Sequence, residues 1–183
     1  MDWYALIKLA HIICAVVWVG GGFALMLAAI RADNAGDIAG TLQVMRTIGQ
    51  LGNRLFMPTS MLTLLFGLIM CWFWVGFGDL WIVLALIGFA VSAGIGSAVF
   101  KPTADRMNAS IAKDGVTPAV MDEGRKILRI ARLDYTIMLL VVVDMVLKPT
   151  GDDFALLAVM GLLLVAGIVA AFGTGARSAA AQA

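Results

Sequence analysis

The stretch LWIVLALIGFAVSAGIGSAVF, residues 80–100, contains no charged side chain. About 20 apolar residues in a helix, each rising 1.5 Å, are enough to cross the hydrocarbon core of a bilayer. Four further stretches are long and predominantly apolar: Trp3–Ile30, Phe56–Val75, Ala131–Val146 and Phe154–Phe172. The alternating pattern of membrane β-barrels does not occur in the sequence. We therefore predict an all-α integral membrane helical bundle with about five transmembrane helices.

Composition supports this class. Of the 183 residues, 62% are hydrophobic and only 14% are charged, whereas a soluble domain carries roughly a quarter charged residues. We expect one transmembrane helical domain over residues 1–176 and a flexible C-terminal tail over residues 177–183. The net charge of +1 gives no reason to expect nucleic acid. The expected partners are the lipid bilayer and further copies of the chain in a homo-oligomer. The sequence does not indicate which protein would be its redox partner.

The distribution of lysine and arginine predicts the orientation. In a five-span arrangement, eleven of the 13 basic residues fall on one side of the membrane. Lys8 and Lys148 alone lie near the other side. Because basic residues concentrate in cytoplasmic loops, we predict an N-terminus outside and a C-terminus in the cytoplasm.

Two polar segments on the predicted cytoplasmic side are expected to be helical, near residues 34–54 and 104–127. Asp33 and Asn34 are suitable N-caps for the first. Thr117 followed by Pro118 is typical of a helix start, and a helix beginning there can continue into the fourth span.

His11 is the only histidine of the chain and lies inside the first span. An ionisable side chain in a membrane helix needs a partner and is a candidate for function. Histidine is also a common ligand of haem iron. Counting residues along the helices places Gly67, Met70, Gly88 and Met138 at a depth comparable to that of His11. We predict a haem b site here, with His11 as metal ligand, the glycines leaving room for a flat ring and a methionine as an optional second ligand.

Two alternatives to haem remain for this level of the bundle. It could serve as a permeation module for copper or another small solute. His11 could instead be only a polar contact that holds two helices together in a non-catalytic membrane protein. Motifs of nucleophilic, phosphate-binding or zinc enzymes do not occur in the sequence, so any enzymatic activity is expected to depend on a bound cofactor.

Two carboxylates lie within or beside the spans. Asp144 precedes Lys148 by four residues, so an ion pair between them is the simplest expectation. Asp134 is expected at a level where Arg54 or Lys101 can meet it. Either carboxylate could also belong to a proton path.

Three blocks of sequence carry a resemblance to known families: KLAHIICAVVWVGG at 8–21, RLFMP with LTLLFG at 54–67, and VVVDMVLKP at 141–149. The chain resembles uncharacterised bacterial integral membrane proteins grouped as domain of unknown function family 2269. This implies a multi-pass protein of the bacterial inner membrane.

The same blocks are similar, more distantly, to membrane protoporphyrinogen oxidases that bind haem b. The opening in which Trp18 follows His11 after six residues resembles copper-resistance membrane proteins. The first similarity implies a haem-binding role for His11, in electron transfer or in haem and porphyrin handling. Those oxidases also use a lysine in the third span, and the matching position here is Val83.

Overall fold

The structure is a computed structural model that describes residues 1–173, so the predicted tail at 177–183 lies outside the described residues. Every regular element within this range is a helix, as expected from the sequence. The chain forms two compact units, Met1–Asp79 and Leu80–Ala183, and each is described by itself. The prediction of one domain over residues 1–176 stays a prediction.

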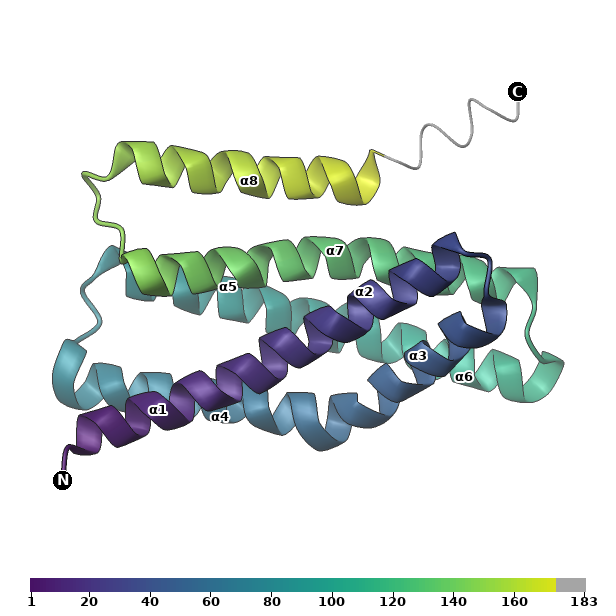
Figure 1. The fold of residues 1–183 in the computed structure, drawn as a ribbon, viewed down its shortest axis with the longest axis horizontal. Helices are drawn as coiled ribbons and strands as arrows, with labels where there is room; N and C mark the ends of the chain where they lie inside the picture. The colour runs from purple at the N-terminus through teal and green to yellow at the C-terminus, as the bar shows by residue number, and fades with distance from the viewer. Residues whose placement is uncertain (174–183) are drawn as a thin grey trace. The chain divides into compact units, whose positions relative to one another are not determined.

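The first unit contains four α-helices joined by a turn and by π-helical segments, in which the helix widens without breaking. These elements are α1 (Trp3–Ala15), η1 (Val16–Gly20), α2 (Gly21–Asn34), α3 (Ile38–Leu51), η2 (Gly52–Phe56), α4 (Met57–Met70) and η3 (Cys71–Val75). α1, η1 and α2 form one long helix, whose first half packs on α4 and second half on α3 (Figure 1).

The turn before α3 differs from the sequence prediction. Gly36 takes a left-handed conformation with φ of 69°, and Asp37 caps α3 by accepting a hydrogen bond from Gly40 N–H at 2.8 Å. The predicted cap at Asp33 and Asn34 is wrong, because α2 continues through Asn34. Asp37 is an equally good cap, and only Gly36 readily adopts the turn conformation that precedes it.

In its described part, up to Gly173, the second unit contains four α-helices and one π-helical segment: α5 (Leu80–Ile95), η4 (Gly96–Phe100), α6 (Lys101–Asp114), α7 (Pro118–Leu147) and α8 (Phe154–Phe172). α7 is its central element, because α5, α6 and α8 all pack against it. α5 contributes a regularly spaced buried face of Ile82, Ala85, Gly88 and Ser92.

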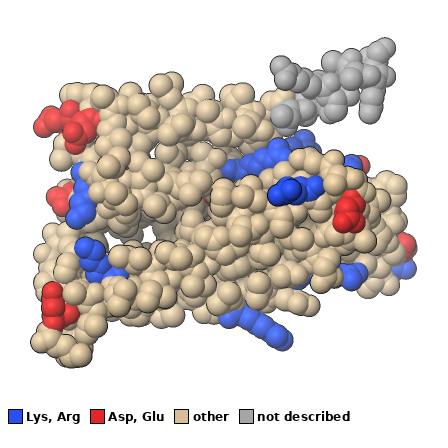
Figure 2. Space-filling view, in the orientation of Figure 1, with Lys and Arg blue, Asp and Glu red and all other residues tan. Residues whose placement is uncertain are grey.

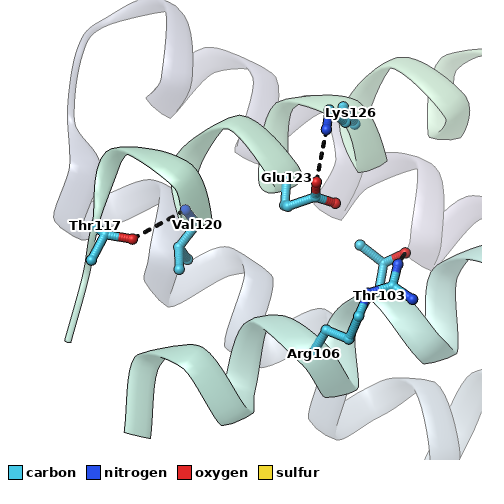
Figure 3. Close-up of polar contacts among 6 residues, drawn as sticks. All are labelled: Thr103, Arg106, Thr117, Val120, Glu123 and Lys126. Atoms are coloured by element: carbon cyan, nitrogen blue, oxygen red, sulfur yellow. Dashed lines mark hydrogen bonds and ion pairs between the residues drawn. The ribbon is translucent and has the colours of Figure 1, made fainter. Parts of the chain in front are cut away.

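The polar segment between α5 and the apolar half of α7 consists of two helices rather than one. Gly115, with φ of 74°, ends α6, and Thr117 then caps α7 by accepting the Val120 N–H at 3.4 Å (Figure 3). The helix start at Thr117 and Pro118 is therefore confirmed. One turn later, Lys126 Nζ lies 2.7 Å from Glu123 Oε1, and this hydrogen bond and charge lower the pKa of the Glu123 carboxyl.

Four helical stretches are long and apolar enough to cross a membrane, by length and composition: Trp3–Asn34, Ile38–Val75, Leu80–Asp114 and Phe154–Phe172. α8 illustrates the character of these stretches. It contains no charged residue, and Leu162 in its middle is 69% exposed. Acidic side chains gather only at its beginning (Figure 2). An exposed apolar surface of this length is typical of a helix that contacts lipid.

Gly88 provides a stability prediction for the α5–α7 packing. A Cβ atom at this position would collide with Cγ2 of Val141, whose branched side chain has little rotamer freedom in a helix. We expect Gly88→Ala to lower the free energy of unfolding by about 1–3 kcal/mol, the usual cost of overpacking. Far-UV circular dichroism during denaturation by dodecyl sulfate measures this.

Gly94 is the matched control on the same helix, since a Cβ there has no neighbour within 4 Å. Gly94→Ala should leave stability unchanged or raise it, because alanine favours the helix more than glycine does. Combining Gly88→Ala with Val141→Ala should restore most of the loss. Equal effects of the two single alanine substitutions would contradict the packing argument.

Candidate functional site

His11 in α1 is bound to the backbone of α4. Its Nδ1 lies 2.8 Å from the carbonyl oxygen of Thr63, 52 residues away in sequence. A carbonyl oxygen has two lone pairs, so it can accept this bond in addition to the helical one. The expectation that His11 has a polar partner is therefore confirmed. The contact joins the first and second candidate spans inside the first unit.

This hydrogen bond determines the chemistry of the imidazole. A carbonyl can only accept, so Nδ1 must carry the proton, and the neutral ring then presents an unprotonated Nε2. The side chain is half-buried, and its hydrogen bond at Nδ1 fixes the orientation of the ring. Histidines that bind metals are commonly held in this way, with one nitrogen donating to a carbonyl and the other free to coordinate.

Gly67 lies directly against the ring. A Cβ atom at Gly67 would be 3.5 Å from His11 Nδ1, an ordinary contact, and 3.2 Å from His11 Cε1, which is closer than ordinary packing allows. The depth comparison correctly brought Gly67 to the level of His11. Its lack of a side chain makes room for the imidazole itself, and Gly67 follows Thr63 by one helical turn.

The α1 face that bears His11 also carries Tyr4 and Lys8, at the helical spacing of four and three residues. Lys8 Nζ lies 5.9 Å from the centre of the Tyr4 ring, and the Tyr4 and Trp74 rings are 5.6 Å apart. A cation and two amphipathic rings are typical of a membrane–water interface. His11 is therefore only about two turns from a polar end of the α1–α4 pair.

Hydroxyl groups near His11 bond within their own helix. Thr63 Oγ1 donates to the Thr59 carbonyl at 2.8 Å, and Ser60 Oγ donates to the Met57 carbonyl at 2.9 Å. Neither hydroxyl binds the imidazole. Met70 lies one turn beyond Gly67 on the same face of α4, so it remains the candidate second ligand within the first unit.

Gly88 and Met138, the other two residues expected at this level, belong to the second unit. Gly88 makes room for Val141 of α7, and Met138 is buried with 3% of its surface exposed. Each therefore has a packing role within its own unit. Their assignment to a cofactor stays a prediction.

The carboxylates behave differently from the sequence expectations. Ser92 of α5 forms a side-chain hydrogen bond with Asp134, in place of the expected Lys101. A contact with Arg54, which belongs to the first unit, stays a prediction. Asp144 does not pair with Lys148, whose Nζ instead lies 4.9 Å from the centre of the Trp81 ring. Lys148 ends α7 in a left-handed conformation, φ 49°, so the helical spacing assumed for an ion pair is lost.

Within residues 1–173, no group of three or more His, Cys, Asp or Glu side chains could hold a metal ion. A family model for predicted integral membrane proteins, DUF2269, matches residues 5–149. The chain belongs to the DUF2269 family. The match contains His11, Thr63 and Gly67, so the whole α1–α4 contact lies inside the DUF2269 region. Comparison with curated proteins and with solved structures gives no significant match.

Proposed function

We propose that this DUF2269 protein binds haem b in the membrane, that Nε2 of His11 would hold its iron, and that the protein acts in electron transfer or in haem handling. The observation that carries the proposal is the hydrogen bond from His11 Nδ1 to the Thr63 carbonyl. It supports a neutral imidazole whose second nitrogen is a ready ligand in apolar surroundings.

Haem suits these residues better than a bare metal ion does. The porphyrin itself supplies the equatorial ligands of the iron, so one histidine from the protein is sufficient. A bare copper or zinc ion needs several protein donors brought together. The residues of this chain would hold the group, orient it through the fixed imidazole and exclude water, while the iron supplies one-electron chemistry when bound.

Absorption spectroscopy of the purified full-length protein tests this function. Protein expressed with ample haem, or titrated with haemin in detergent, should show a Soret band that saturates at one haem per chain. The pyridine haemochrome spectrum should identify haem b. A protein that stays colourless under both conditions would defeat the proposal.

A second candidate function follows from the same contact. His11 also holds α1 against α4, and a polar bond between membrane helices contributes about 0.6 kcal/mol on average. In that case His11 would be a structural contact of a non-catalytic protein. Haem binding distinguishes the two candidates, because Nε2 of His11 would bind iron only in the first of them.

We further propose a five-span arrangement in a bacterial inner membrane, with the N-terminus outside and the C-terminus in the cytoplasm. Beside the four long apolar helices, this arrangement has one more span, the fourth in chain order, which is the second half of α7 from about Ala131. Most of the charges of α7 lie in its first half, before that point. This places α3, α6 and the beginning of α7 on the cytoplasmic side, where the basic residues concentrate.

Cysteine labelling tests this topology. In a background with Cys14→Ser and Cys71→Ser, a cysteine at Gly151, in the α7–α8 turn, should react with a membrane-impermeant maleimide added to intact cells. A cysteine at Ser110 in α6 should react only after the membrane is opened. Both positions are exposed, so access depends on the side of the membrane. Labelling of Ser110→Cys in intact cells would contradict the orientation.

A further inference from the structure

A second site, independent of haem, lies at the end of α7 in the second unit. Asp144 is 1% exposed, and neither Oδ1 nor Oδ2 has a hydrogen-bond partner. Burying an ionised carboxylate without a partner is so costly that such a group normally takes up a proton instead. Unlike a surface aspartate, Asp144 therefore has no hydrogen-bond partner that would stabilise its ionised form.

The surroundings of Asp144 within the second unit supply no compensating charge. α5 and α8, which pack on α7, contain no titratable acid, base or histidine. α6, which carries acidic and basic groups, is joined by the turn at Gly115 to the beginning of α7, the end of that helix opposite to Asp144. Asp153 of the α7–α8 turn is bonded to Thr150. The nearest cation in sequence, Lys148, lies over the Trp81 ring.

The helix itself also disfavours a negative charge at this position. Asp144 is in the last turn of α7, and its carbonyl accepts the N–H of Lys148 at 2.7 Å. The C-terminal end of a helix carries a partial negative charge, which opposes a carboxylate and favours a neutral acid. Leu147 and Lys148, one turn further, are exposed. Water is therefore only one helical turn away.

We propose that Asp144 is a proton-binding site: it is held as a neutral carboxylic acid and exchanges its proton with water at the α7–α8 turn. In this exchange the O–H bond of the acid breaks, the proton passes to water, and the electron pair stays on the carboxylate. Asp134 provides the contrast on the same helix, about 15 Å away along its axis. Asp134 is also buried and its Oδ1 lacks a hydrogen-bond partner, but Ser92 donates a hydrogen bond to its carboxyl group, whereas Asp144 has none.

Infrared spectroscopy of the full-length protein in phosphatidylcholine vesicles tests this site without any substitution. At neutral pH the wild-type protein should show the carbonyl stretching band of a carboxylic acid, shifted downward in D2O. Asp144→Asn, which has the same shape, should abolish the band in an Asp134→Asn background, where no other buried carboxyl of α7 remains. The matched variant Asp134→Asn should leave it in place. A wild-type spectrum with carboxylate bands alone at neutral pH would overturn the proposal.

Two further measurements separate a neutral acid from a hidden ion pair. An apolar carbodiimide, dicyclohexylcarbodiimide, reacts with protonated carboxyls in membranes and should label the α7 peptide at Asp144 at neutral pH. The label should be lost in Asp144→Asn. Lys148→Met should leave the infrared band and the label unchanged. An acid band that arises only in Lys148→Met would mean that Lys148 keeps Asp144 ionised, which would also overturn the proposal.

Discussion

Replacing His11 with alanine is expected to abolish the Soret band of the haem-loaded protein. The substitution removes the only imidazole of the chain and therefore the proposed axial ligand. It also removes the hydrogen bond to the Thr63 carbonyl, which costs little because the carbonyl keeps its helical bond. The protein should remain helical and lose essentially all of its bound haem. Absorbance at the Soret band, normalised to protein concentration, measures the loss.

Two control variants distinguish ligation from a general disturbance of α1 and α4. Cys14→Ser changes a free thiol one turn after His11 and should leave the band nearly unchanged. Thr63→Ala should also retain haem, because His11 bonds the backbone of Thr63 and not its hydroxyl. An unchanged Soret band in His11→Ala would show that another group holds the haem. Equal losses in all three variants would point to misfolding.

The sequence predicted the apolar spans well because hydropathy and length depend only on residue type. Four of the five expected spans are recovered as long apolar helices, and Thr117 with Pro118 starts α7 as expected. The remaining expected span, Ala131–Val146, forms the second half of α7. The polar first half of α7 continues into this apolar half without a break. α7 as a whole is therefore amphipathic and charged rather than uniformly apolar.

The site was predictable in part. Residue counting from the membrane surface brought Gly67 to the level of His11, since rise per residue is the same in every helix. The partner of His11 could not be found in this way. It is a backbone carbonyl, and every residue has one, so the sequence contains no signal for it.

The charged residues were predicted least well. An ion pair between Asp144 and Lys148 assumes that the helix continues through both residues, whereas α7 ends between them. Lys148 adopts a left-handed conformation that glycine and asparagine usually occupy. Its side chain then meets Trp81, which lies 67 residues earlier in the sequence. Contacts of this kind depend on tertiary packing, and local spacing rules do not describe them.

Replacing Gly67 with valine is expected to weaken haem binding at least about fivefold, although the His11 side chain itself is retained. A Cβ atom at this position already comes within 3.2 Å of His11 Cε1, and the two methyl groups of valine extend further. The imidazole must then move away from Thr63 or the helices must separate, at a typical overpacking cost of about 1–3 kcal/mol. If that cost falls on the haem-bound geometry, it corresponds to roughly a fivefold to a 150-fold loss of affinity. Titration with haemin measures it.

Two further variants test whether the effect of Gly67→Val arises from the contact with the His11 ring. Gly67→Ala should cause a smaller loss than Gly67→Val, because its single methyl requires the ring to shift by only a few tenths of an ångström. Gly20→Val is the control on the long first helix, where a Cβ atom has no neighbour within 4 Å, and it should bind haem like the wild type. Wild-type affinity in Gly67→Val would mean that the contact between Gly67 and the imidazole does not determine the position of Nε2. The hydrogen bond to Thr63 could then no longer be the feature that prepares His11 for iron.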